Sequence, residues 1–92
     1  MFYTYVLKSL IIRKFYTGYT DNLQDRLDHH NAGKSVYTKR YMPWEIAFSE
    51  AFQTKAEAIK REKYFKSAAG RRWLKKMLIN KADVAKWQTH WV

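Results

Sequence analysis

Hydrophobic positions near the start of the chain follow the pattern of two short strands. Residues 2–7 are rich in aromatic and β-branched side chains, which favour extended backbone, and residues 15–18 repeat this character. Residues 8–14 join the two runs as a hairpin, and the apolar side chains at 10–12 are compatible with an extension of either strand. The pattern therefore predicts two neighbouring strands and leaves their register open.

A helical pattern follows the second strand. Asp21 and Gln24 have the spacing of a capping box, which predicts a helix that begins there and runs to about Asn31. Gly33 lies just beyond this end, where glycine is favoured because it adopts the left-handed conformation without steric cost. These residues predict a short helix with defined ends.

One face of this helix is apolar. At about 100° per residue, Leu23 and Leu27 form its buried stripe. Arg26 and His30 lie within about 60° of Leu23 on the same projection. Both side chains are therefore expected to flank the apolar stripe, one helical turn apart.

A polar, basic loop separates this helix from a third strand. The loop spans residues 33–43 and is closed by Pro43, and residues 44–51 are rich in strand-forming side chains. The chain then returns to helical patterns, and no repeat or low-complexity segment interrupts it. We expect the third strand to pair with the first two.

Two helices are predicted in the second half of the chain. Thr54 and Glu57 form a capping box that opens one helix, and Ser67 caps a further helix that ends near Ile79. Their apolar positions are Ala58, Ile59 and Phe65 in the first and Trp73, Leu74, Met77 and Leu78 in the second. Glu62 falls in the middle of the first apolar arc, where a carboxylate is not expected.

The order β-β-α-β-α-α predicts an α+β domain with a small, mostly antiparallel three-stranded sheet flanked by helices. Residues 1–79 make up this domain, since no linker divides them. Residues 80–92 contain two tryptophans and form either a short helix or an adhesive tail, with Trp87 and Trp91 as candidate interface residues. The expected oligomeric state is a monomer or a weak homodimer.

The net charge of +10 indicates a polyanionic partner, and nucleic acid is the default. The excess is concentrated in the second half, and eight basic residues but one acid lie between Lys60 and Lys76. A solvated face of an ordinary basic protein remains an alternative. An anionic membrane surface is a weaker one, because core residues interrupt the basic segment.

The chain has no cysteine, which excludes disulfides, a thiol nucleophile and a cysteine-based zinc site. The N-terminus lacks the basic flank and long apolar run of a signal peptide, and no apolar run is long enough to span a membrane. We expect a cytoplasmic protein without a membrane partner.

Glu62 is the most informative candidate for chemistry. A carboxylate in an apolar stripe costs free energy unless it is paired or bound to a cation. Arg26, Arg61 and Lys66 are candidate ion-pair partners. The other possibility is a hard-cation site, since Mg²⁺ needs only one or two carboxylates when water and phosphate supply the remaining ligands.

Four further residues are candidates for a phosphate site. Arg26 can bind phosphate oxygens with its guanidinium, and His30 can orient a water or accept a proton. Tyr5 and Tyr16 are expected on adjacent strands, and a tyrosine acts as a base only when its pKa lies well below about 10. Each also has a purely structural interpretation: a surface arginine, a packed histidine and two packed tyrosines.

In their order along the chain, these residues resemble the motifs of the GIY-YIG nuclease domain. Tyr3-Thr4-Tyr5 occupies the place of the first tripeptide and keeps only its tyrosine, and Tyr16-Thr17-Gly18 occupies the place of the second. Arg26 and His30 match the arginine and histidine of the following helix, and Glu62 matches the metal-binding glutamate of a later helix. The resemblance covers roughly residues 2–78 and is closest to small standalone bacterial members.

This resemblance implies a one-metal mechanism. Glu62 would hold one divalent cation, Mg²⁺ or Mn²⁺, at the scissile phosphate. Tyr5 would activate the attacking water, Tyr16 and His30 would position or relay it, and Arg26 would stabilise the pentacovalent phosphate. The basic residues expected to hold the DNA backbone without reading bases are Lys34, Lys39, Arg40, Lys60, Lys63, Lys66, Arg71 and Arg72.

The implied function is a metal-dependent DNA endonuclease of low sequence specificity that acts on branched, nicked or single-stranded DNA, with DNA repair as its expected setting. Two alternatives stay open. One is a nucleic-acid-binding protein that keeps the fold without catalysis, and the altered first tripeptide favours it. The other is a small adaptor whose basic face meets an acidic protein.

Overall fold

The computed structural model describes residues 1–79 and 90–91. Its elements are β1 (Phe2–Ser9), β2 (Lys14–Thr20), α1 (Leu23–Asn31), the 3₁₀ helix η1 (Thr38–Tyr41), β3 (Trp44–Phe52), α2 (Lys55–Lys66), α3 (Ala68–Ile79) and β4 (His90–Trp91). The predicted α+β class and the order β-β-α-β-α-α are confirmed for residues 1–79. The expectation for the tail at residues 80–92 lies outside the described residues, apart from the two-residue strand β4.

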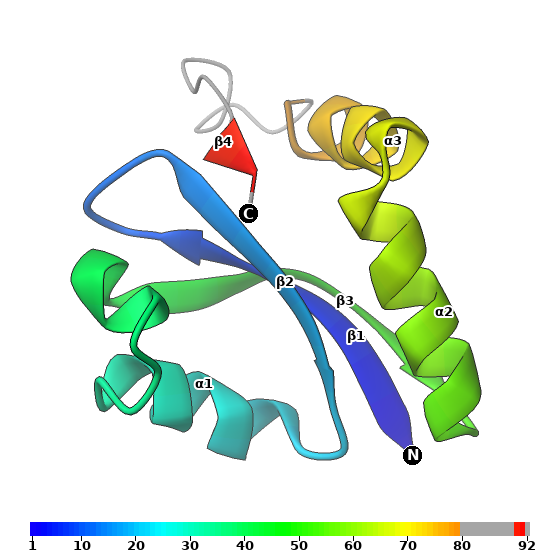
Figure 1. The fold of residues 1–92 in the computed structure, drawn as a ribbon, viewed down its shortest axis with the longest axis horizontal. Coiled ribbons are helices and arrows are strands. Elements are labelled where there is room, and N and C mark those ends of the chain that lie inside the picture. The colour runs from blue at the N-terminus through cyan, green and yellow to red at the C-terminus, as the bar shows by residue number, and fades with distance from the viewer. Residues whose placement is uncertain (80–89, 92) are drawn as a thin grey trace.

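The sheet has the strand order β3-β1-β2-β4 (Figure 1). β1 runs antiparallel to both of its neighbours, while β4 pairs in parallel with the start of β2. Leu10, Ile11 and Ile12 extend neither strand but are exposed in the hairpin between them. The backbone amides of Ile11 and Ile12 donate to Ser9 Oγ, which closes this turn.

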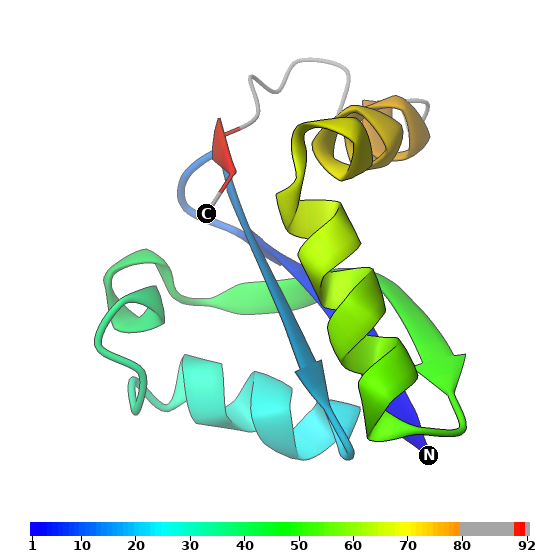
Figure 2. The same ribbon diagram turned by 45° about the vertical axis from the view of Figure 1, so that its right-hand side comes forward.

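Helices cover both faces of the sheet. Figures 1 and 2 show α1 and η1 on one side and α2 with α3 on the other. Because side chains alternate along β1, Val6 packs with Phe15 and Phe65 towards α2 and α3, while Tyr5 and Leu7 pack on the opposite face. The sheet thus separates two small cores.

The helix ends follow local hydrogen bonding. The N-cap of α1 is Asn22, whose Oδ1 accepts from the Asp25 amide at 3.1 Å, so the predicted capping box from Asp21 to Gln24 is wrong by one position. Asn22 caps the helix because its side chain reaches the backbone amide of Asp25, the third helical residue, after the strand has ended at Thr20. Gly33 follows the helix with a φ of +76°, as the pattern predicts.

The capping box of α2 is present: Thr54 accepts from the Glu57 amide and the Glu57 carboxylate accepts from Thr54. Ser67 Oγ accepts from the Gly70 amide at the start of α3. A Cβ at Gly70 would lie 1.9 Å from the carbonyl oxygen of Tyr64, so the sharp corner between α2 and α3 requires glycine.

The buried stripe of α3 is narrower than predicted. Leu74 and Leu78 are buried and Trp73 packs against the same core, but Met77 is 42% exposed. Met77 therefore lies outside the core cluster that contains Leu74 and Leu78. Within the described residues, no helix is both long enough and apolar enough to cross a membrane.

Candidate active site

Tyr5 reaches its position because a glycine faces it. The register of β1 and β2 pairs Tyr5 with Gly18 and Leu7 with Tyr16. A Cβ at position 18 would lie 2.6 Å from the phenolic oxygen of Tyr5, so glycine leaves the space that the phenol occupies. Tyr16 is the diagonal neighbour on the same face, with its ring centroid 6.5 Å from that of Tyr5.

His30 joins Tyr5 to the loop that contains η1. Its Nε2 lies 3.2 Å from the hydroxyl of Tyr5, and its Nδ1 lies 2.7 Å from Oγ1 of Thr38. All three residues are buried, with exposures of 3% for Tyr5, 2% for His30 and 0% for Thr38. The result is a hydrogen-bonded row of a phenol, an imidazole and a hydroxyl.

Burial controls the protonation of this row. It raises the pKa of Tyr5, and the neighbouring Tyr16 adds to the increase while Arg26 opposes it. Burial also lowers the pKa of His30 to about 4, helped by the positive charges of His29 and Arg26. At neutral pH Tyr5 is therefore a phenol and His30 a neutral imidazole. The raised pKa of Tyr5 is the opposite of the lowered pKa that a tyrosine acting alone as a base requires, so Tyr5 can take a proton only if it passes its own to a neighbour.

A cavity of about 420 Å³ lies where β2 passes into α1 and where α2 begins. Four of the five predicted catalytic residues line it: Tyr5, Tyr16, Arg26 and Glu62. His30 lies behind the two tyrosines, with its ring centroid 5.0 Å from that of Tyr16. The structure therefore brings residues from β1, β2, α1 and α2 to one concave surface.

Glu62 is the anionic group of this cavity on α2. Its side chain is 16% exposed, and its Oε2 accepts from Nζ of Lys66 at 3.1 Å. Arg61 is not its partner, because the guanidinium bonds to Glu50 on β3 at 2.7 Å. Of the candidate ion-pair partners of Glu62, Lys66 is the one that forms the ion pair.

The donor set at the cavity fits a hard divalent cation. Among the described residues, no three His, Asp or Glu side chains cluster as a complete metal cage. Glu62 and Asp21 each contribute a carboxylate to the cavity wall. One or two carboxylates are what Mg²⁺ or Mn²⁺ takes from a protein when water and a phosphate complete the coordination.

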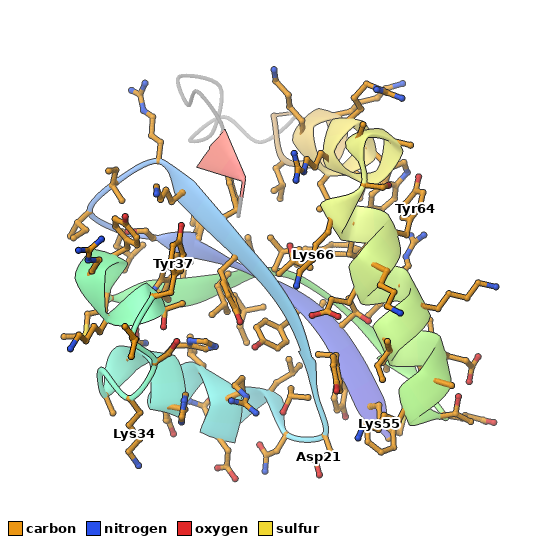
Figure 3. All side chains as sticks on the ribbon, in the orientation of Figure 1. Asp21, Lys34, Tyr37, Lys55, Tyr64 and Lys66 are labelled. Carbon is orange, nitrogen blue, oxygen red and sulfur yellow. The ribbon has the colours of Figure 1, made fainter. Side chains whose placement is uncertain are left out.

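Three residues at or behind the cavity were not predicted from the sequence. Lys55 lines the wall with its Nζ 6.0 Å from the centre of the Tyr19 ring, and Asp21 lines the same cavity. Figure 3 shows Asp21 and Lys55 on the same side of the molecule, at the turn after β2 and the start of α2. Thr38 supports the site from behind, although its position in a polar loop predicts exposure.

The predicted DNA-binding residues do not form one patch. Lys34, Lys39 and Arg40 belong to the loop around η1, whereas Lys60, Lys63, Lys66, Arg71 and Arg72 lie on α2 and α3. In Figure 3, Lys34 lies far from Lys66, which points from α2 towards the centre of the molecule. Lys60 lines a separate cavity with Phe52 and Tyr64. The two basic groups therefore lie on different elements, and none of these eight residues lines the cavity of the candidate site.

Comparison with known families gives one match that covers most of the chain. The family model described as the GIY-YIG catalytic domain matches residues 1–77. This range contains every candidate catalytic residue and ends just before the C-terminus of α3. No solved structure gives a significant match to the chain.

The chain is also similar to small bacterial proteins. It is 39% identical to a UPF0213 protein of Bacillus pumilus over 96% of this chain and 88% of that relative. It is 39% identical to UPF0213 protein SH2523 of Staphylococcus haemolyticus, over 79% and 89% of the two chains. The match to UPF0213 protein YazA of Bacillus subtilis is 49% identical and spans 56% of this chain and 54% of the relative. These names state no activity.

Proposed function

This chain belongs to the GIY-YIG catalytic domain family, and on that premise we propose that it is a metal-dependent endonuclease that hydrolyses phosphodiester bonds in DNA. The observation that carries the proposal is the convergence of Tyr5, Tyr16, Arg26 and Glu62 on one cavity. A phenol, a guanidinium and a carboxylate from separate elements are the groups that water activation, phosphate binding and cation binding require.

Arg26 is the phosphate-binding residue of this proposal. It lines the cavity from α1, and its guanidinium is charged at every accessible pH. A phosphate bound there gains charge on its non-bridging oxygens as water attacks, and a fixed cation stabilises that charge more than the ground state. Lys55 adds a second positive group to the same wall.

Tyr5 and His30 transfer the proton of the attacking water. As the oxygen–phosphorus bond forms, the water proton passes to the phenolic oxygen of Tyr5, and the phenolic proton passes to Nε2 of His30. The burial that raises the pKa of Tyr5 disfavours a free phenolate, so the two transfers accompany each other. The bond to the leaving oxygen breaks, and solvent protonates that oxygen.

Glu62 would hold the divalent cation, and Asp21 provides a second carboxylate to the same cavity. When bound, Mg²⁺ or Mn²⁺ supplies Lewis-acid polarisation of the phosphate and charge neutralisation. Lys66 balances the Glu62 carboxylate through their ion pair.

The basic residues supply affinity for the DNA backbone. Those on α2 and α3 lie on one side of the sheet, and those of the η1 loop lie on the other. Contacts of this kind go to phosphates and carry no base information, so low sequence specificity is expected. A cysteine-free chain of this type suits the reducing cytoplasm.

Nicking of supercoiled DNA tests the proposal. The purified protein is incubated with supercoiled, single-stranded and branched DNA, with Mg²⁺ or Mn²⁺ and with chelator. We expect metal-dependent nicking that Glu62→Gln and Arg26→Ala abolish while DNA binding persists. Glu45→Gln and Arg13→Ala, which change exposed residues away from the cavity, serve as matched controls and should retain activity.

Two outcomes would contradict the proposal. Nicking that is unchanged in Glu62→Gln and Arg26→Ala would identify a contaminating nuclease. Tight, salt-sensitive DNA binding without cleavage under any metal condition would favour the non-catalytic binding protein on the same fold.

A further inference from the structure

We propose that Thr38 is a positioning residue that holds His30 in the tautomer protonated at Nδ1, so that Nε2 is free to accept the proton of Tyr5. The part of this inference that concerns catalysis rests on the proposed function. It assigns a role to the loop of residues 33–43, which the sequence pattern connects only with DNA binding.

The geometry of Thr38 is that of a fixed support. Its Oγ1 lies 2.7 Å from Nδ1 of His30, and the threonine has no exposed surface. Its carbonyl oxygen accepts a hydrogen bond from Nε1 of Trp44 at 2.9 Å. Because Trp44 is itself buried at the start of β3, Thr38 is attached to the sheet as well as to α1.

The two ring nitrogens of His30 compete for one proton. In one arrangement Nδ1–H donates to Thr38 Oγ1 and the phenol of Tyr5 donates to Nε2. In the other, the threonine hydroxyl donates to Nδ1, and Nε2–H points at the oxygen of Tyr5. Both arrangements satisfy the observed distances of 2.7 Å and 3.2 Å.

Only the first arrangement can take a proton from Tyr5. In the second, Nε2 already carries a hydrogen and has no free lone pair in the ring plane with which to accept another. A hydroxyl that acts as acceptor at Nδ1 therefore makes the proton transfer possible.

Nitrogen NMR of His30 tests the inference without any reaction. In protein labelled with ¹⁵N-histidine, the shifts of Nδ1 and Nε2 report which nitrogen carries the proton. We expect the Nδ1–H form in the wild type and in Thr38→Ser, which keeps the hydroxyl. Thr38→Val keeps the shape but has no acceptor, so we expect a shift towards the Nε2–H form. With Mg²⁺, kcat for nicking should fall about 10- to 100-fold in Thr38→Val, with little change in KM.

The outcomes separate the two proposals. An Nε2–H form in the wild type, or an unchanged tautomer in Thr38→Val, overturns the role of Thr38 whatever the activity. The expected tautomers in a protein that cleaves no DNA would overturn the nuclease proposal and leave the hydrogen-bond assignment in place. If Thr38→Val does not fold, the wild type and Thr38→Ser still decide the tautomer.

A second observation, independent of the first, concerns the exposed aromatic surface of the η1 loop. We propose that Tyr37 stacks on an unpaired base of the DNA substrate, which deepens the proposed function by naming its substrate class. The preferred DNA would then carry unpaired nucleotides near the cleaved bond.

Tyr37 combines an exposed ring with a fixed cation. It is 38% exposed, and Nζ of Lys14 lies 3.3 Å from its hydroxyl. The same ammonium lies 4.3 Å from the centre of the Tyr41 ring and 3.2 Å from the Tyr41 hydroxyl. An aromatic face beside cations is the arrangement that binds single strands, because bases stack while phosphates meet positive charge.

Position and charge favour a nucleic-acid strand over a protein. Successive ring contacts of 5.5 to 6.5 Å lead from Tyr16 at the cavity through Trp44 and Tyr41 to Tyr37. The surrounding loop adds Lys34, Lys39 and Arg40, and the sequence from residue 29 to residue 44 contains no Asp or Glu. Tyr37 is therefore linked to the cavity through packed rings, and the loop that carries it presents one sign of charge to a nucleic-acid strand.

Binding of an oligonucleotide without metal tests this site. Fluorescence anisotropy with labelled oligo-dT and with a duplex is measured for the wild type, Tyr37→Leu and Tyr37→Phe. We expect Tyr37→Leu to weaken single-strand binding about 5- to 20-fold with little effect on duplex, whereas Tyr37→Phe keeps the ring and the affinity. Tyr64→Leu is the matched control, because Tyr64 is 37% exposed and lies on the opposite side of the molecule (Figure 3).

Equal losses in Tyr37→Phe and Tyr37→Leu would show that the hydroxyl bond to Lys14 matters and would overturn stacking. Equal losses for duplex and single strand, or a loss as large in Tyr64→Leu, would also overturn it. Metal is absent throughout, so a failure of nicking does not affect the result.

Discussion

Tyr5 and Gly18 face each other across β1 and β2, and the phenol of Tyr5 fills the space that a side chain at position 18 would need. The presence of glycine in the second tripeptide thus has a steric explanation. It allows a buried tyrosine to place its hydroxyl between His30 and the cavity. The lack of a side chain at position 18 thus links the register of β1 and β2 to the position of a candidate catalytic hydroxyl.

Replacement of Gly18 by alanine should displace Tyr5. The added Cβ would lie 2.6 Å from the phenolic oxygen and 2.8 Å from Cζ, so the ring must move. We expect a decrease of about 1–3 kcal/mol in the free energy of unfolding, as for other overpacked cores. Urea denaturation measures this decrease, and DNA nicking should be lost with the hydrogen bond to His30.

A double-mutant cycle isolates the steric cause. Tyr5→Leu removes the ring, so Gly18→Ala should cost much less stability in that background than in the wild type. Equal costs in both backgrounds would show that the glycine is required for a reason other than Tyr5.

The fold was largely predictable because its signals are local. The capping box at Thr54 and the glycine after α1 depend only on nearby residues, and both are present in the structure. Met77 was assigned to the core because periodicity gives the angle of a side chain but not the width of the surface that covers it. The position of the N-cap of α1 was not predictable to the residue, because Asp21 and its neighbour Asn22 both belong to residue types that favour it.

The residues of the candidate site were predictable from the sequence, but the contacts that join them were not. Tyr5, Arg26 and Glu62 follow from chemistry and from the family resemblance. Thr38 gives no signal, because a threonine in a polar loop has no periodicity that marks its burial against α1. The pairing of Tyr5 with Gly18 depends on a register that the hairpin sequence leaves open.

Lys66 and a divalent cation should compete for the Glu62 carboxylate. The ammonium lies 3.1 Å from Oε2, and a cation bound there must displace or share that contact. Lys66→Met should therefore strengthen Mn²⁺ binding about two- to fivefold, the effect of an ion pair worth up to about 1 kcal/mol. Isothermal titration calorimetry measures the affinity.

Lys75→Met, at an exposed position of α3 outside the cavity, is the control for the removal of one positive charge. An equal gain in this variant would assign the effect to net charge and not to the pair. Loss of Mn²⁺ binding in Lys66→Met would contradict the assignment of Glu62 as the ligand.

Arg61 should contribute to stability and not to DNA binding, although it lies in the most basic part of the sequence. Its guanidinium bonds to Glu50 at 2.7 Å and lies 4.5 Å from the centre of the Phe65 ring and 5.2 Å from that of Trp73. Arg61→Ala should lower the free energy of unfolding by about 2 kcal/mol, the combined effect of a partly buried ion pair and cation–π contacts.

Exposed Lys63 should behave in the opposite way. Lys63→Ala should leave stability nearly unchanged but reduce the salt dependence of DNA binding, since each phosphate contact contributes about 0.9 to the slope. Binding titrations at several salt concentrations give this slope. A larger loss of slope in Arg61→Ala than in Lys63→Ala would show that the guanidinium contacts DNA.

Stability should depend on pH through His30. The imidazole is buried against Tyr5 and Tyr16, and His29 and Arg26 add positive charge nearby, so its pKa falls from 6.5 to about 4. Between these values the unfolded chain binds a proton that the folded chain does not. The free energy of unfolding must therefore fall as the pH falls from 6.5 to about 4, by up to about 1.4 kcal/mol for each unit.

His30→Gln separates this contribution from the titration of carboxylates. Glutamine cannot take up the proton, so the variant should be less stable than the wild type at pH 7, but the difference should narrow as the pH falls. Urea denaturation at half-unit steps of pH measures both curves. Parallel curves would show that His30 keeps an ordinary pKa in the folded protein and that its burial does not disfavour the charged imidazolium.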